Sequence, residues 1–317
     1  MPIYEAEVNP AAENNSHALM LRLVGPDRHV LDVGCATGYL GEALIAQGCR
    51  VSGVELDPEA AERARKVLDD VLVADLETAD LVEHFGAGSF DVVVFGDVLE
   101  HLRDPQRLLR NAVGLLADKG SIVISIPNVT HGAVRLALLQ GRWEYHGTGL
   151  LDRTHVSFFS RATLTEMVRG AGLVPVDFRS TTAELFATEI GIDRGALPDG
   201  IADWVERQPD ADVYQFVLRA IKDDADGAVE ALRLRYEAAL RESAEQIAAD
   251  RVEIAADRAE IEARRAELEA LSATVAGLGE RAAGAERDLH ELADTRSVRA
   301  LRGPRGAYGW ARGKLAR

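Results

Sequence analysis

The fold is decided by residues 29–41, which read HVLDVGCATGYLG. The first five residues are apolar and β-rich and predict a buried strand, and the small residues after them predict a tight turn. A helix is expected to start near Tyr39. Glycines in such a turn let the backbone approach a bound molecule closely. The stretch therefore predicts a strand, a turn and a helix, with a binding site at the turn.

On both sides of this stretch, short β-rich runs alternate with helical patterns up to about Ala220, which indicates a mainly parallel sheet flanked by helices. Seven strands are expected, at 29–33, 50–55, 71–74, 91–95, 121–126, 174–179 and 213–219. Because no long helix separates the last two, we expect the sheet to end in an antiparallel pair. The predicted fold is α/β, a Rossmann-like sheet of seven strands with helices on both faces.

The chain beyond Asp223 changes in composition to Ala, Glu, Arg and Leu, and Pro is absent until Pro304. Apolar residues recur every seven positions there, which predicts a long helix over 223–297 that forms a coiled coil between copies of the chain. The column consists of Leu240, Ile247, Ile254, Ile261, Leu268, Val275, Ala282 and Leu289. A single charged helix that packs on its own domain or lies free is the alternative.

The net charge of −16 is unevenly distributed. The residues from Arg296 onward carry six Arg and one Lys with no acid, which leaves −23 on the rest of the chain. An acidic protein is a poor general binder of nucleic acid, because that binding requires basic surface. The basic tail, 298–317, also contains Tyr308 and Trp310 and suits the anionic inner face of the plasma membrane. A disordered basic end is the alternative.

The remaining bulk properties predict a cytoplasmic protein. No apolar stretch approaches the roughly 20 residues needed to cross a bilayer, and the N-terminal arm, 1–16, lacks the basic start and apolar run of a secretory signal. Cys35 and Cys49 fall in segments that are expected to be buried, so no disulfide framework is indicated. The main domain is expected to span 17–222.

The glycine turn taken alone is ambiguous. Ala36, Gly38 and Gly41 nearly match a dinucleotide fingerprint, and Glu55 ends the second strand where a ribose-binding acid belongs. An NAD-dependent sugar oxidoreductase and an ordinary strand-to-helix turn both remain alternatives at this point. Asp32 argues against the first of them, because a carboxylate beside the turn repels a pyrophosphate and attracts a cation.

Two further strand ends place acids and turn residues at the same edge of the sheet. Asp75 closes the third strand, and the fourth strand runs from FDVVVFGD into VLEHL. Ligands collect at this edge in open α/β sheets. Over about 14–220 the pattern resembles the class I S-adenosylmethionine-dependent methyltransferases.

The resemblance implies a role for each matching residue in binding S-adenosylmethionine. Asp32 would lie near the ammonium of the cofactor, and Glu55 would accept from both ribose hydroxyls. Asp75 would accept from the adenine amino group. The remaining positions would contact the methionine portion (Gly34, Cys35 and Gly38), the adenine ring faces (Leu56 and Leu76) and, through the backbone, the amino-acid end (Phe95 and Gly96).

Candidate catalytic residues follow the fourth strand and precede a later helix. Asp97, Glu100 and His101 lie within one helical turn of each other, and His155 stands just ahead of the helix that starts near Arg161. A hydroxyl that accepts a methyl group has a high pKa, so a base or a cation must help to remove its proton. Either histidine is a candidate base.

This edge is similar to that of ubiquinone-pathway O-methyltransferases and small-RNA 2′-O-methyltransferases, where a Glu-x-x-Glu-His run and a later His hold a divalent cation. Asp97 stands here in place of the first Glu. By that resemblance Asp97, Glu100, His101 and His155 would bind Mg or Mn. A metal-free base and a purely structural role for both histidines are the alternatives.

The segment 132–159, called the cover segment below, is longer than a plain connection and is expected to cover the acceptor. Trp143 and Tyr145 would stack on a sugar or ring face, and Arg135, Arg142 and Arg153 would hold an anionic group. The chain is also similar to methyltransferases that accompany bacterial cell-surface polysaccharide synthesis, some of which carry a C-terminal coiled coil. This resemblance implies O-methylation of a glycan or another hydroxylated or lipid-linked acceptor. A non-catalytic scaffold that uses the coiled coil is the other alternative.

Overall fold

The structure is a computed structural model that describes residues 8–294. The first part of the expected N-terminal arm and the basic tail therefore lie outside the described residues. Two compact units are distinguished, 1–240 and 241–317. In 8–294, no helix is long and apolar enough to span a membrane.

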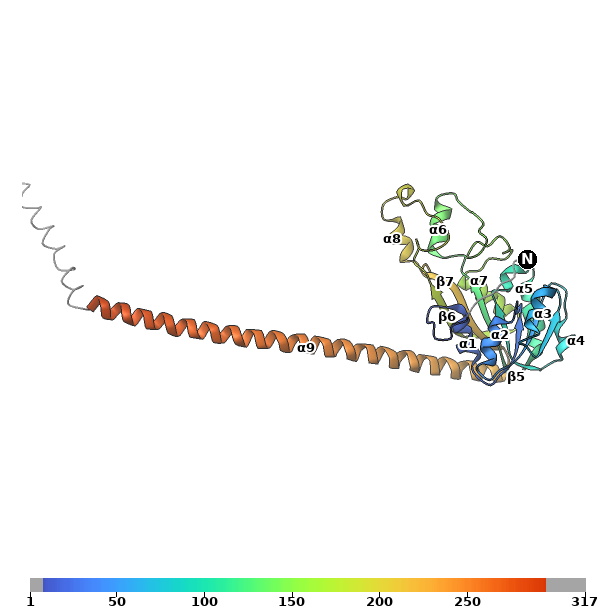
Figure 1. The fold of residues 1–317 in the computed structure, drawn as a ribbon, viewed down its shortest axis with the longest axis horizontal. Helices are drawn as coiled ribbons and strands as arrows, with labels where there is room; N and C mark the ends of the chain where they lie inside the picture. The colour runs from blue at the N-terminus through green and yellow to red at the C-terminus, as the bar shows by residue number, and fades with distance from the viewer. Residues whose placement is uncertain (1–7, 295–317) are drawn as a thin grey trace, which may run out of the picture. The chain divides into compact units, whose positions relative to one another are not determined.

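The first unit is built on a sheet flanked by helices (Figure 1). The sheet has seven strands, as predicted, and their order is β3-β2-β1-β4-β5-β7-β6. β7 is antiparallel to both of its neighbours, β5 and β6, and the other pairs are parallel. The strands are β1 His29–Val33, β2 Arg50–Glu55, β3 Asp70–Val73, β4 Phe90–Gly96, β5 Leu116–Pro127, β6 Leu173–Thr182 and β7 Val213–Lys222. The strand order reverses between β1 and β4, where ligands bind in folds of this type.

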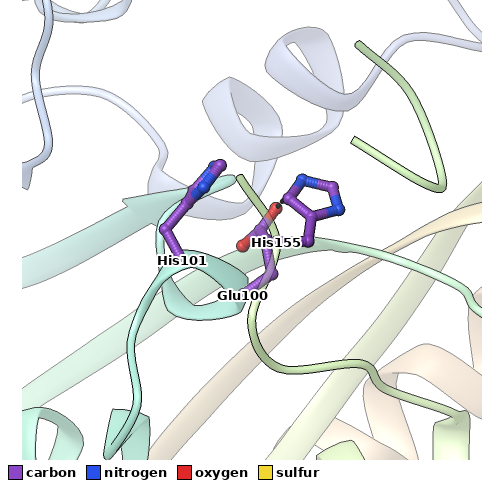
Figure 2. Close-up of side chains that lie close together, drawn as sticks. All are labelled: Glu100, His101 and His155. Carbon is purple, nitrogen blue, oxygen red and sulfur yellow. Dashed lines mark ion pairs between the residues drawn. The ribbon is translucent and has the colours of Figure 1, made fainter. Parts of the chain in front are cut away.

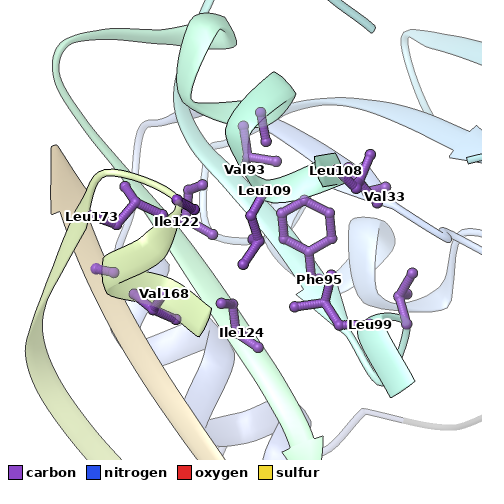
Figure 3. Close-up of a cluster of buried hydrophobic side chains, with 14 of the residues drawn as sticks. Val33, Val93, Phe95, Leu99, Leu108, Leu109, Ile122, Ile124, Val168 and Leu173 are labelled. Atoms are coloured by element: carbon purple, nitrogen blue, oxygen red, sulfur yellow. The ribbon is translucent and has the colours of Figure 1, made fainter. Parts of the chain in front are cut away.

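Helices cover both faces of the sheet. α1, α2 and α3 pack on one face, and α4, α5 and α7 pack on the other. The helices are α1 Ser16–Val24, α2 Tyr39–Ile45, α3 Pro58–Ala64, α4 Leu81–Phe85, α5 Pro105–Leu115, α6 Gly132–Leu139, α7 Arg161–Gly170, α8 Ile201–Glu206 and α9 Ala225–Asp294, with short 3₁₀ turns at η1 Leu99–His101 and η2 Arg194–Ala196. Figure 3 shows the core under α5 and α7, where Phe95 and Ile124 of the sheet meet Leu109.

Local sequence sets where these helices begin. Asp57 and Asp104 accept backbone N–H bonds as N-caps, and a proline follows each of them at the first helical position. Ser160 opens α7 through a capping box with Thr163. Because α7 begins there, the loop before it is held close to η1, and this places the residues of the candidate active site.

The helix α9 runs without interruption from Ala225 to Asp294 (Figure 1). Leu234 packs against Val176 and Ile221, so the first turns belong to the core of the first unit. The predicted long helix is thus present in the described residues, and the coiled coil stays a prediction.

Candidate active site

The turn after β1 lies at the centre of the site and is held in a left-handed conformation. Gly34 has φ +79°, and a side chain there would come within 2.5 Å of Val98 Cγ2. Ala36 also has a positive φ, +48°, which costs an L residue about 1–2 kcal/mol. Its backbone N–H donates to Glu55 Oε2 over 2.9 Å, and this bond fixes the turn against the end of β2.

A cavity of about 260 Å³ lies beside this turn, and we call it the cofactor cavity. It brings together five of the residues expected to bind the cofactor from the ends of three strands, β1, β2 and β3: Gly34, Glu55, Leu56, Asp75 and Leu76. Oε1 of Glu55 accepts from the N–H groups of Leu56 and Asp57, both over 2.8 Å. The carboxylate therefore has a fixed position at the wall of the cavity.

Other residues expected near the cofactor lie behind the cavity wall. The Cys35 side chain is 2 % exposed and packs on Gly53, so only its backbone belongs to the turn. Gly38 faces α3, where a Cβ would lie 3.2 Å from the Ala64 Cα. The side chain of Phe95 is buried in the core under α5. These residues shape the turn and the strand end rather than line the cofactor cavity.

Asp32 is buried beneath the turn and has one oxygen, Oδ2, without a hydrogen-bond partner. Burial, and then the negative charge of Glu55, raise the pKa of Asp32 to about 7. A buried carboxylate of this kind is expected to pair with a cation or to take up a proton. Asp32 does not line the cofactor cavity, so its pairing with the ammonium group of the cofactor stays a prediction.

The pKa of Asp32 predicts a pH dependence for cofactor binding. The carboxylate must be ionised to pair with an ammonium group, so affinity for S-adenosylmethionine should fall as the pH drops below about 7. The limiting slope is about tenfold per pH unit. Calorimetric titrations between pH 5.5 and 7 measure it, and Asp32→Asn should remove the slope. A wild-type affinity that is flat over this range would contradict the pairing.

A second cavity, of about 280 Å³, adjoins the first, and we call it the acceptor cavity. Four residues line both cavities: Gly34, Ala36, Asp97 and His101. Four parts of the chain supply the other walls of the acceptor cavity: α1, α2, the cover segment and β7. Their lining residues are His17, Tyr39, Thr148, Gly149, Tyr214 and Gln215. The two cavities meet at the switch point between β1 and β4.

Glu100, His101 and His155 form a cluster in the acceptor cavity, shown in Figure 2. Each residue offers a ligand atom within 4.8 Å of the others, and the His155 Nε2 to Glu100 Oε1 distance is 4.0 Å. The loop that carries His155 is bonded to η1 at several points. The N–H groups of Val156 and Ser157 donate to the Glu100 carbonyl, and His101 Nδ1 lies 3.2 Å from the Thr154 carbonyl oxygen.

The environment of this cluster favours uncharged side chains. Glu100 is 1 % exposed, and neither carboxylate oxygen has a hydrogen-bond partner. Burial and the nearby charge of Asp97 raise the pKa of Glu100 well above its usual range. Burial and then His101 lower the pKa of His155, so its imidazole is neutral near pH 7. A neutral imidazole can accept a proton or bind a metal ion.

Asp97 does not belong to this cluster, so the expected set of four ligands is reduced to three. Its backbone is left-handed, with φ +56°, and lies before η1 rather than within its turn. Its Oδ1 accepts from Ser125 Oγ over 2.8 Å and from Gln215 Nε2 over 2.9 Å. These bonds hold Asp97 on β5 and β7, at the boundary between the cavities.

The arginines of the cover segment are engaged within the protein. Arg135 donates to the carbonyls of Thr130 and Pro209, and Arg142 donates to Glu144 and to the Gly191 carbonyl. Arg135 and Arg142 thus have partners within the chain, and the binding of an anionic group by the three arginines stays a prediction. Trp143 and Tyr145 remain partly exposed, and the Trp143 ring lies 5.4 Å from that of Phe158.

The sequence-based analysis missed several residues of the acceptor cavity. His17, Tyr214 and Gln215 carry no motif, and Tyr39 is expected only as the start of a helix, because α1, α2 and β7 bring these residues together only in the folded chain. The predicted antiparallel end of the sheet could have indicated Tyr214 and Gln215, since it places the start of β7 beside the end of β5.

Comparison with known proteins decides the family. A family model described as a methyltransferase domain matches residues 8–177. The chain belongs to this methyltransferase family. Its fold is the Rossmann-like fold of class I S-adenosylmethionine-dependent methyltransferases, and membership implies S-adenosylmethionine as the cofactor.

Curated relatives include ubiquinone biosynthesis O-methyltransferases. That of Xanthomonas axonopodis pv. citri (strain 306) is 34 % identical over 157 residues, which are 48 % of this chain and 65 % of the relative. That of Coxiella burnetii (strain Dugway 5J108-111) is 25 % identical over 169 residues, 53 % of this chain and 72 % of the relative. The match thus spans slightly less than two thirds of the first relative's length.

Solved structures of low sequence identity are also similar. A putative methyltransferase in complex with the Haloferax volcanii Trm112 activator has a TM-score of 0.46 and 18 % identity, covering 66 % of this chain and 89 % of that one. The Burkholderia thailandensis 1,6-didemethyltoxoflavin-N1-methyltransferase has a TM-score of 0.43 and 20 % identity, covering 67 % and 80 %.

Proposed function

We propose that the chain is an S-adenosylmethionine-dependent O-methyltransferase that acts on a hydroxylated acceptor. The observation that carries the proposal is the meeting of two cavities, one lined by Glu55 and Asp75 and the other by His101 and His155. Such an arrangement would hold a methyl donor and an acceptor in line, and positioning of this kind supplies a large part of the rate. The family match leaves the nicotinamide alternative without support.

The cofactor, when bound, supplies an electrophilic methyl group on a sulfonium. The chain would then act through His155, whose neutral imidazole takes the proton of the acceptor hydroxyl as the new oxygen–carbon bond forms and the sulfur–carbon bond breaks. The nearer oxygen of Glu100 lies 4.0 Å from His155 Nε2, so Glu100 would stabilise the imidazolium that results only when its carboxyl group is ionised. Asp32 and Glu55 would orient the donor.

The same cluster of Glu100, His101 and His155 also fits a divalent cation. A bound cation is the alternative to His155 acting as a base without metal. A buried carboxylate without partners and two imidazoles are a donor set that suits Mn better than Mg. Glu100, His101 and His155 would hold the ion, which would lower the pKa of an acceptor hydroxyl bound to it.

Removal of metal distinguishes these alternatives. If an ion is required, treatment of the protein with a strong chelator should lower methyl transfer at least tenfold, and Mn should restore it. Binding of S-adenosylmethionine should change little, because Glu100 and His155 lie outside the cofactor cavity and only His101 lines both cavities. Activity that is unchanged by the chelator would exclude the ion and leave the metal-free base.

The proposed acceptor is a glycan or a lipid-linked hydroxyl compound. The similarity to ubiquinone biosynthesis O-methyltransferases supports oxygen as the accepting atom. The exposed rings of Trp143 and Tyr145, 6.3 Å apart on the cover segment, support a sugar or ring face beside the site. We also propose, from the sequence alone, that the basic tail contacts an anionic membrane and that the protein is located in the cytoplasm.

The experiment that tests the proposed function is methyl transfer from isotopically labelled S-adenosylmethionine to surface glycans and lipids, read by mass spectrometry. The expected product carries the label as an O-methyl group and is absent with Glu55→Ala. A labelled methyl group attached to nitrogen or carbon instead of oxygen, or no transfer to any hydroxyl compound, would contradict the proposal. The scaffold alternative would be excluded by any transfer that Glu55→Ala abolishes.

A further inference from the structure

A long apolar stripe along α9 is exposed in the single chain. The heptad column that includes Ile254, Leu268 and Val275 is at least half exposed at each of its large side chains. A second column, three residues further on, contains Leu271, Leu278 and Leu292 and is also more than half exposed. An apolar seam of this kind is the surface that helices bury against each other in coiled coils.

The two columns meet as a continuous seam only in the second half of the helix, and we call this part the α9 seam. Its members are Leu268, Leu271, Val275, Leu278, Ala282, Ala285, Leu289 and Leu292. Before it, the second column holds Asp250, Asp257 and Arg264. In heptad terms the first column is position a and the second is position d.

Charges at the flanking positions e and g specify a direction. In a parallel pair, each g residue faces the e residue five places further on in the partner. Three such pairs in α9 have opposite charges: Glu253 with Arg258, Glu260 with Arg265, and Arg281 with Glu286. The other pairs between positions g and e, from Gln246 to Thr274, each include a neutral residue, so no g-to-e pair along 246–286 brings like charges together.

An antiparallel pair would be less favourable for two reasons. If the whole helices overlapped, the α9 seam would face about residues 227–251 of the partner, where the second column holds Ser243 and Asp250, and Asp250 would be buried against apolar side chains. If only the α9 seam overlapped, the pairs formed by Glu253 and Glu260 would be lost. A parallel pair places each leucine layer opposite its own copy.

We propose that two copies of this chain pair in parallel and in register through α9. The α9 seam supplies the apolar contact, and the flanking charges set the direction. A β-branched residue at position a followed by Leu at position d favours a coiled coil of two helices, and Val275 and Leu278 form this combination. The first half of the helix contributes mainly through its flanks, because Asp250 and Asp257 would each face their own copy.

A first experiment measures the mass of the full-length protein by light scattering at tens of micromolar. We expect the mass of two chains, and of one chain for the double variant Leu271→Asp, Leu278→Asp. The matched control is Val252→Asp, which changes a side chain 72 % exposed and outside the seam and should leave two chains. A wild-type mass of one chain or of three chains would overturn the proposal.

A second experiment tests direction by disulfide formation. Leu271→Cys and Leu292→Cys, made separately, should each link two chains under mild oxidation, because both face their own copy only in a parallel pair. An antiparallel pair can place at most one of these positions opposite itself. Arg287→Cys, on the outer face, is the control, and the native Cys35 and Cys49 are buried. Linkage at only one of the two seam positions, or at neither, would overturn the parallel arrangement.

Discussion

Glu55→Gln is expected to weaken the binding of S-adenosylmethionine by roughly 100-fold. The carboxylate is fixed at the wall of the cofactor cavity by three backbone N–H groups and would accept from both ribose hydroxyls. A hydrogen bond to a charged group contributes about 1.5–3 kcal/mol, so loss of the charge across two such bonds costs about 3 kcal/mol. Isothermal titration calorimetry measures the change.

Glu59→Gln is the matched control for this prediction. Glu59 lies four residues further on in α3, is exposed and does not line the cofactor cavity. It should bind S-adenosylmethionine with the wild-type affinity and unfold at the wild-type temperature, whereas Glu55→Gln should unfold at a somewhat lower temperature, because an amide replaces only one of the two oxygens that accept backbone N–H bonds. An affinity of Glu55→Gln within threefold of the wild type would show that the carboxylate does not contact the ribose.

His155→Ala is expected to lower kcat by about 100- to 10,000-fold, the range over which positioned bases act. The side chain lines the acceptor cavity but not the cofactor cavity, so the dissociation constant of S-adenosylmethionine should stay within twofold. Steady-state kinetics with the acceptor, together with calorimetry, separate the two quantities.

His84→Ala provides the comparison, because His84 lies on α4 outside both cavities, with a side chain 43 % exposed that contacts Asp70 over 3.7 Å and the ring of Phe85. Its kcat should equal that of the wild type. If His155→Ala retains a kcat within threefold of the wild type, the imidazole has a packing role against Phe158 and His101 rather than a chemical one.

The fold could be predicted from sequence because the strands of the sheet are short apolar runs separated by clear turn residues. β1 and β2 agree with the prediction at both ends. β5 begins at Leu116, five residues earlier than expected, because Leu116 pairs with Phe90 of β4. The polar residues Asp118 and Lys119 therefore lie within the strand. Such pairing is a tertiary contact that local pattern does not contain.

The candidate site was predictable where it depends on strand ends. Glu55 and Asp75 follow neighbouring parallel strands, whose carboxyl ends share one edge of the sheet, and the structure brings both to one cavity. The position of the Asp97 carboxylate could not be predicted from the sequence pattern. Its spacing to Glu100 suits a helical face, but its left-handed backbone turns the carboxylate to Ser125 and Gln215.

The central claim is that the cavity beside the glycine turn binds a sulfonium amino-acid cofactor rather than a dinucleotide. Calorimetric titration of the wild-type chain with S-adenosylmethionine and, separately, with NAD at pH 7.5 tests it most directly. We expect one site per chain, micromolar affinity for S-adenosylmethionine, and no measurable heat with NAD at millimolar concentration. Tighter binding of NAD than of S-adenosylmethionine would contradict it.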